Sequence, residues 1–175
     1  MSVTLEFNKT MDFHRISENE FEDELKSLYD LQFSFEFKDV KCTCCWDLSQ
    51  QQVYFYALGI TKYSKNKFYF KIGYIEYQCI GYSVKIHDFE IFQKKRKGFG
   101  TFFLNFFEVK LKEIYSTKIK IIAGELINTP KRYNNKSPNE IFIILLNFYR
   151  RSGYIVTRNN SDYTLGYLKK EINQG

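Results

Sequence analysis

A basic stretch with two glycines is the most chemically informative part of this sequence. Four consecutive cationic side chains, Lys94 to Lys97, are followed by Gly98, Phe99 and Gly100. Cationic side chains attract anions, and glycines let the backbone approach a ligand because no Cβ stands in the way. Backbone N–H groups in such a loop bind phosphate oxygens when a helix follows directly. The stretch therefore predicts a site for a phosphate or pyrophosphate.

The flanking residues predict a strand before this loop and a helix after it. Residues 84–92 read VKIHDFEIF, which is rich in β-branched and aromatic residues. The first N–H groups of a helix lack intrahelical partners and lie at the positive end of the helix dipole. A helix is expected from about Thr101, because apolar residues then recur at spacings of three and four. These residues are Phe103, Phe106, Phe107 and Leu111.

Length and composition predict one globular domain spanning residues 1–175. The chain is 44% hydrophobic and 19% aromatic, with 18 Phe and 14 Tyr. A chain of this length usually forms a single domain and buries a substantial core. We therefore expect a core rich in aromatic rings.

The distribution of charge bears on the kind of partner. The net charge is +6, and most of it comes from the Lys94–Lys97 run. Proteins that bind along nucleic acid usually spread positive charge over a face or a helix. Concentration in one loop favours a small polyanionic ligand and disfavours nucleic acid.

Neither a secretory signal nor a membrane span is expected. The first residues contain no continuous apolar core, and no apolar run reaches about 18 residues. The sequence thus predicts a soluble, cytoplasmic protein with no membrane partner.

The cysteines do not follow a metal-binding pattern. Cys42, Cys44 and Cys45 are crowded together and Cys79 is distant, whereas zinc sites usually contain paired Cys-x-x-Cys spacing. We expect no metal, and reduced thiols that pack as small apolar side chains.

Several elements are expected before the basic loop. A first strand is predicted at Val3–Phe7 or at Met11–Ile16, and a helix follows to about Leu31, with Ser17 and Glu20 forming a capping box. Its buried face is expected to carry Phe21, Leu25 and Leu28. Residues 32–52 favour a short second helix or an irregular connection. Three long β segments are then predicted at 53–63, 67–82 and 83–92, with turns at Lys65-Asn66 and at Cys79–Gly81.

After the loop helix, residues 118–126 predict a strand parallel to the one before the loop. The next helix is the best specified, because Ser137 is an N-cap, Pro138 suits the first turn and Glu140 completes a capping box. Gly153 is expected to end it. A closing hairpin should pair residues 154–156 with 163–168 across the turn at 159–162. The buried face of the helix is predicted to contain Ile141, Ile144, Leu145 and Phe148.

Two motifs in this order resemble those of GNAT-family N-acetyltransferases. Lys95-x-x-Gly98-x-Gly100 resembles the Arg/Gln-x-x-Gly-x-Gly/Ala loop, with Lys in place of Arg or Gln. Residues 148–154, FYRRSGY, resemble the FYxxxGF end of the fourth helix, with Tyr as the last aromatic residue. Residues 123–126, AGEL, look like the fifth strand of one bacterial subgroup. The resemblance covers about residues 53–168.

The resemblance implies an α+β fold with α/β/α layers, the GNAT acyl-CoA N-acyltransferase fold. We would then expect a mixed central sheet of about seven strands, splayed between the fourth and fifth, and about four flanking helices. It also implies an enzyme that uses acetyl-CoA as co-substrate and transfers the acetyl group to a primary amine by direct attack in a ternary complex. Dimers are common in the family, so a homodimer is a further expectation.

The resemblance assigns roles to individual residues. The backbone of Ile91 and Phe92 would bind the acetyl thioester and pantetheine, and Asn128 would contact the pantetheine arm. Tyr149 matches the tyrosine that protonates the departing thiolate. The pyrophosphate would be held by Lys95, Arg96, Lys97, Gly98, Phe99, Gly100 and Thr101.

The general base is not fixed by a motif. Glu90, Asp88 and His87 on the strand before the loop and Glu125 on the next strand are candidates, of which Glu125 and Glu90 are favoured. Strand alternation puts Asp88 and Glu90 on one face and His87 on the other.

Two alternative functions stay open. One is a non-catalytic module of the same fold that binds CoA or a protein partner. The other is a nucleic-acid-binding protein that uses Lys94–Lys97, for which binding would depend steeply on salt. The amine acceptor is also open: an amino acid, a polyamine, an aminoglycoside, a peptide N-terminus or an aminoacyl-tRNA.

Overall fold

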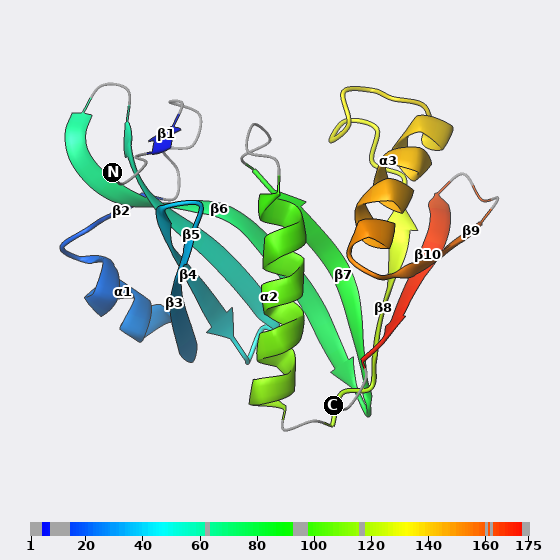
Figure 1. Cartoon of the computed structure of the whole chain (residues 1–175), viewed down its shortest axis with the longest axis horizontal. Coiled ribbons are helices and arrows are strands. Elements are labelled where there is room, and N and C mark those ends of the chain that lie inside the picture. Colours follow the sequence, from blue (N-terminus) through cyan, green and yellow to red (C-terminus); the bar gives the residue numbers. More distant parts are fainter. Residues whose placement is uncertain are drawn as a thin grey trace. The chain divides into compact units, whose positions relative to one another are not determined.

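The computed structural model describes residues 5–7, 15–61, 64–92, 98–115, 118–159, 161 and 163–172, with the backbone alone for 5–7, 61, 64 and 65. Its elements form two compact units (Figure 1). Unit 1 comprises Met1–Glu76 and Asp88–Lys95, and unit 2 comprises Tyr77–His87 and Arg96–Gly175. The fold class is α+β, with a mixed, largely antiparallel set of strands.

Unit 1 is a set of antiparallel strands with one short helix. Its central strands are neighbours in the order β3-β4-β5-β6, while β1 pairs parallel with β5 and β2 antiparallel with β6. The strands β6 and β7 each run from one unit into the other. The elements are β1 (Leu5–Phe7), β2 (Arg15–Ser17), α1 (Phe21–Leu28), β3 (Leu31–Phe37), β4 (Val40–Asp47), β5 (Gln52–Thr61), β6 (Ser64–Ile80) and β7 (Ser83–Ile91).

The expectation of a second helix or irregular chain at residues 32–52 was wrong. This segment is the hairpin β3–β4, paired from Leu31↔Trp46 to Phe37↔Val40. Its turn consists of Lys38 and Asp39, which both adopt positive φ, 53° and 61°. Such turns usually contain Asn or Gly, so the sequence carried a weak turn signal. The period-two alternation of β3, LQFSFEF, was the readable sign of a strand.

The first helix is shorter than predicted. Ser17 and Glu20 do bond, with Ser17 Oγ donating to Glu20 Oε2 at 2.7 Å, but they close the turn before α1 rather than cap it. Phe21 and Leu25 are buried as expected, whereas Leu28 is 54% exposed. Tyr29, just beyond the helix, packs against the buried cluster in place of Leu28.

The face that α1 covers is lined with aromatic rings. Phe21 stacks on Tyr69 with ring centroids 3.5 Å apart, and the hydroxyls of Tyr29 and Tyr56 are 2.8 Å apart. Cys45 belongs to the same cluster. Burial raises the pKa of Tyr29 to about 12, because the phenolate would lose its hydration there. The expected aromatic core is therefore present in unit 1.

The predicted β segments correspond to β5, β6 and β7, with one turn misplaced. Lys65 and Asn66 lie within β6 rather than in a turn, and residues 62–63, which separate β5 from β6, lie outside the described residues. The second turn, predicted at Cys79–Gly81, is at Gly81 and Tyr82, because Cys79 and Ile80 still belong to β6. Gly81 has φ of 59°.

Unit 2 contains the parallel crossover that the sequence predicts. Its strands are neighbours in the order β7-β8-β10-β9, with β7 and β8 parallel and the other pairs antiparallel. The helix α2 (Phe99–Ile114) connects β7 to β8 (Ile121–Ile127). The helix α3 (Pro138–Arg151) precedes the hairpin of β9 (Ile155–Arg158) and β10 (Thr164–Glu171). This hairpin confirms the predicted pairing.

The pairing of β7 with β8 is short. It runs from Ser83↔Ile121 to Ile86↔Gly124, and no further pair between these two strands is found among the described residues. The strand β7 nevertheless continues to Ile91, and β8 continues to Ile127 while paired with β10. The described pairing between the predicted fourth and fifth strands therefore lies entirely within unit 2, and the expected splay stays a prediction.

The two helices of unit 2 bury most of the residues expected. On α2, Phe103, Phe107 and Leu111 are buried, whereas Phe106 is only partly buried. On α3 the prediction for Ile144 was wrong: it is exposed, and the buried side chains are Ile141, Phe142 and Tyr149. The helix is therefore rotated relative to the predicted face. None of the described helices has the length and apolar composition that a membrane crossing requires.

Candidate functional site

The amino terminus of α2 has the properties of an anion site. Its N-cap is Gly98, whose φ of 106° lies in the left-handed region that favours glycine. A glycine has no side chain to accept hydrogen bonds from the first turn, and that turn contains no acidic residue. The first helical hydrogen bond runs from Phe102 N–H to the Gly98 carbonyl at 3.0 Å. The N–H groups of Phe99, Gly100 and Thr101 thus precede the helical bonding pattern, at the positive end of the helix.

The amino terminus of α3 provides an internal comparison. Ser137 N–H donates to Glu140 Oε2 at 2.9 Å, and Glu140 N–H donates to Ser137 Oγ at 3.4 Å, which confirms the predicted capping box. The Ser137 backbone bond lowers the pKa of Glu140, because it favours the ionised carboxylate. The first turn of α3 therefore already binds a carboxylate of its own, that of Glu140, whereas the first turn of α2 contains no acidic side chain.

The described part of the predicted phosphate loop begins at Gly98. Lys95, Arg96 and Lys97 lie outside the described residues, so their roles stay predictions. Phe99 anchors the first turn of α2, since its side chain is buried and its ring lies 5.3 Å from that of Phe103. Thr101 is partly buried in the same turn.

In unit 1, the end of β7 is held tightly against β6. Phe92 N–H donates to the Ile72 carbonyl at 2.8 Å, and the Phe92 ring lies 5.9 Å from that of Tyr74. A Cβ at Gly73 would lie 2.6 Å from both the Glu90 carbonyl oxygen and Ile91 Cδ1, so this close approach requires glycine. The backbone at residues 90–92 is therefore held against β6 by a hydrogen bond and close packing.

The acid candidate Tyr149 lies in the last turn of α3. Its side chain is 7% exposed. Its ring packs edge-on against Phe148, 4.9 Å away, and against Tyr154, 5.5 Å away. The ring is thus held on two sides by aromatic neighbours.

The base candidates have different surroundings. Glu125 Oε1 lies 2.7 Å from Lys85 Nζ, an ion pair between β8 and β7. Glu90 is partly buried on β7. Asp88 accepts hydrogen bonds from the Tyr74 hydroxyl and from Phe89 N–H. His87 is exposed, and its ring nitrogen lies 3.4 Å from Gln78 Oε1.

Asn128 follows β8 directly. Its N–H donates to the Tyr163 carbonyl at 2.8 Å, next to the irregularity in the pairing of β10 with β8 between Thr164 and Gly166. Among the described residues, no group of three or more His, Cys, Asp or Glu side chains is arranged to hold a metal ion. Cys42, Cys44 and Cys45 are buried on β4, and none of them forms a disulfide.

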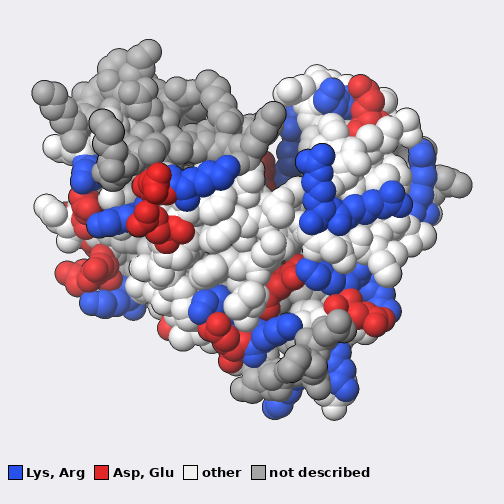
Figure 2. Space-filling view, in the orientation of Figure 1, with Lys and Arg blue, Asp and Glu red and all other residues white. Residues whose placement is uncertain are grey.

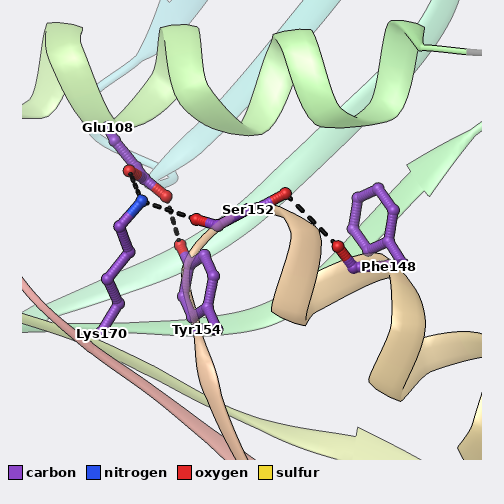
Figure 3. A network of polar contacts seen from close by, with 5 residues as sticks. All are labelled: Glu108, Phe148, Ser152, Tyr154 and Lys170. Carbon is purple, nitrogen blue, oxygen red and sulfur yellow. Dashed lines mark hydrogen bonds and ion pairs between the residues drawn. The ribbon is translucent and has the colours of Figure 1, made fainter.

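Sequence reasoning missed a polar network in unit 2. Glu108 on α2 bonds to Lys170 on β10 and to the hydroxyl of Tyr154 (Figure 3). These partners are 62 and 46 residues away in sequence, so no local pattern joins them. The available signal was the position of Glu108 directly after Phe107 on the apolar side of the helix.

The surface shows both signs of charge. Lys and Arg side chains gather over the part of unit 2 that contains α3, and Asp and Glu are interspersed with cations elsewhere on the visible face (Figure 2).

No protein-family model and no curated protein matches the chain. Among solved structures, it is similar to Ard1 from Thermoplasma volcanium, with 11% identity, a TM-score of 0.48 and coverage of 73% of this chain and 74% of the other. It is also similar to a Bacillus subtilis acetyltransferase in complex with CoA, with 16% identity, a TM-score of 0.39 and coverage of 91% and 99%. A third similar structure is an aminoglycoside 6′-N-acetyltransferase complexed with coenzyme A, with 18% identity, a TM-score of 0.40 and coverage of 71% and 76%.

Proposed function

We propose that this protein is a GNAT-type N-acetyltransferase, which uses acetyl-CoA to acetylate a primary amine by direct attack in a ternary complex. The observation that carries the proposal is the amino terminus of α2. It begins at a left-handed Gly98, has no capping side chain of its own and lies within a β7–α2–β8 parallel crossover. The loop before it contributes the Lys94–Lys97 run. A pyrophosphate is the anion that suits such a terminus.

The residues present fit the phosphate part of the co-substrate. Backbone N–H groups from Lys95 to Gly100, together with Thr101, would hold the pyrophosphate. The comparison with α3 supports this assignment, because the Glu140 carboxylate shows how an anion is held at a helix start in this same chain. Acetyl-CoA supplies the activated acetyl group when it is bound.

The pantetheine arm would be held by the backbone of Ile91 and Phe92 and by Asn128. The Phe92 N–H is already engaged by the Ile72 carbonyl, so this N–H is not the group that would contact pantetheine.

The chemistry requires two proton transfers. The neutral amine would attack the thioester carbonyl and lose one proton to Glu125 or Glu90 as the new C–N bond forms and the C–S bond breaks. Tyr149 would give its hydroxyl proton to the departing thiolate. Each positioned acid or base typically contributes about 10²–10⁴-fold to such a reaction.

The proposal is tested by thiol release from acetyl-CoA in the presence of a panel of amines: an amino acid, a polyamine, an aminoglycoside and a peptide. We expect release with at least one class, and Tyr149→Phe should lower kcat by about 10²-fold or more. Tyr82→Phe is the matched control, because Tyr82 lies at an exposed turn. Full activity in Tyr149→Phe would show that Tyr149 is not the proton donor. Binding of acetyl-CoA without any thiol release would favour a non-catalytic module.

A further inference from the structure

A network of polar contacts within unit 2 ties α2, the end of α3 and β10 together (Figure 3). Lys170 Nζ lies 2.6 Å from Glu108 Oε2 and donates to the Ser152 carbonyl at 2.7 Å. The Tyr154 hydroxyl donates to Glu108 Oε1 at 2.8 Å. Both oxygens of one carboxylate are therefore used, one by Lys170 on β10 and the other by Tyr154, which lies between α3 and β9.

Two members of the network are buried and Lys170 is partly buried, with 24% of its side chain exposed. Glu108 is 8% exposed, and the Tyr154 side chain is buried as well. A carboxylate out of water is costly unless it is paired and hydrogen-bonded. Burial and the nearby Glu108 raise the pKa of Tyr154, so its hydroxyl stays protonated and keeps donating.

One arm of the network reaches the carboxyl end of α3. Gly153, with φ of 82°, ends the helix, and Tyr154 N–H donates to the Tyr149 carbonyl at 3.0 Å. This is the hydrogen bond of a glycine-ended helix terminus. The Lys170 ammonium on the Ser152 carbonyl adds a cation at the negative end of the helix dipole. Lys170 therefore fixes the turn that follows Tyr149.

The other arm reaches the Tyr149 ring itself. The Tyr154 ring, anchored by its hydroxyl to Glu108, packs edge-on against Tyr149 with centroids 5.5 Å apart and planes at 73°. The backbone and the ring of Tyr149 are thus both held by groups whose positions depend on Glu108 and Lys170.

We propose that Glu108 and Lys170 are positioning residues that hold Tyr149 in the orientation it needs as the proton donor. This inference rests on the proposed function, which gives Tyr149 that role. The pair acts through its contacts with Ser152, at the end of α3, and with Tyr154.

A double-mutant cycle between Lys170→Met and Tyr149→Phe tests the proposal. We expect Lys170→Met to lower kcat about tenfold while the KM for acetyl-CoA changes less than about twofold. In the Tyr149→Phe background the same substitution should have no further effect, because the group it positions is already gone. Equal effects of Lys170→Met in both backgrounds would overturn the proposal. Lys110→Met is the control, since it breaks the 2.6 Å ion pair of Lys110 with Glu113 on the same helix.

Two further measurements keep the test independent of activity and of folding. Fluorotyrosine at position 149 should give a single sharp ¹⁹F resonance that shifts or broadens in Lys170→Met, and an unchanged resonance would overturn the proposal even in a protein without turnover.

Tyr154→Phe keeps the ring and the Glu108–Lys170 pair, so this variant replaces Lys170→Met if Lys170→Met does not fold. It too should alter the resonance of residue 149, and an unaltered one would count against the ring arm of the network. If the wild-type protein showed no turnover, the proposed function would be contradicted. The ¹⁹F result would then decide whether Glu108 and Lys170 position Tyr149.

Discussion

Lys85 on β7 and Glu125 on β8 form an ion pair with Nζ and Oε1 2.7 Å apart, across the parallel pair of strands on which the crossover is built. The two side chains are 39% and 37% exposed. Ion pairs this exposed contribute about 0–1 kcal/mol to stability. The pair is therefore a weak contributor to folding, and its effect on activity can be measured separately from its effect on stability.

The kinetics of two substitutions are predicted to identify the general base. Glu125→Gln should lower kcat about 10²-fold or more if Glu125 takes the proton, with the free energy of unfolding changed by less than about 1 kcal/mol. Glu90→Gln should then have a much smaller effect. Steady-state kinetics and urea unfolding of both variants provide the comparison, with Glu113→Gln as a control in a similar exposed pair. The reverse order of effects would assign the base to Glu90.

The capping box of α3 is predicted to stabilise the fold. Ser137→Ala removes the hydroxyl that accepts from Glu140 N–H, so unfolding should become easier by about 1 kcal/mol at neutral pH. Urea unfolding measures this difference. Ser27→Ala is the control, because the Ser27 hydroxyl donates to the Glu24 carbonyl within α1 at 2.7 Å and is not the N-cap of that helix. No difference between Ser137→Ala and wild type would mean that the box does not contribute.

The same capping box predicts a pH dependence. Its backbone bond from Ser137, then the Ser137 hydroxyl and Lys136, lower the pKa of Glu140 in the folded protein. A carboxyl with a lowered folded pKa stabilises the fold above its unfolded pKa, and this contribution is lost as the pH falls through the folded value. The advantage of wild type over Glu140→Gln should therefore be present at pH 7 and shrink below about pH 4. An advantage that grew on acidification would contradict this.

The buried cysteines are predicted to resist alkylation. Burial raises the pKa of Cys42 and Cys45 to about 12, so very little thiolate is present at pH 8. Iodoacetamide should alkylate both residues only after denaturation, and mass spectrometry detects the alkylation. Cys79, which is partly exposed, should be labelled first in the native protein. Rapid native labelling of Cys42 or Cys45 would show that β4 is not buried as described.

The sequence predicted those features that depend on a few adjacent residues. Ser137, Pro138 and Glu140 specified the start of α3, and Gly153 its end, because caps are local hydrogen-bonding problems. The β3–β4 hairpin was missed since its turn, Lys38-Asp39, lacks the usual glycine or asparagine. The sequence did not decide which of several apolar residues a helix buries: Leu28 was predicted to be buried and is exposed.

The candidate site likewise contains features that the sequence predicted and features that it did not. Gly98 at the start of α2 follows from the glycine loop and the periodic helix after it, and both could be read directly. The Glu108–Lys170 pair and its link to Tyr154 could not, because strand order brings β10 to α2 only in the folded chain. Long-range partners of a buried charge are set by topology rather than by spacing.

The central claim is that the amino terminus of α2 binds the pyrophosphate of acetyl-CoA, and calorimetric titration with acetyl-CoA tests it most directly. Gly100→Glu places a carboxylate in the first turn, where it suits the helix dipole and should preserve the fold while excluding a second anion. Gly81→Glu is the control for the added charge, because a side chain at that turn meets nothing within 4 Å; since its φ of 59° strains any residue other than glycine, urea unfolding checks that this variant is folded. We predict one binding site for wild type and Gly81→Glu and no binding for Gly100→Glu. Equal affinity in all three proteins, or no binding heat in wild type, would contradict the account.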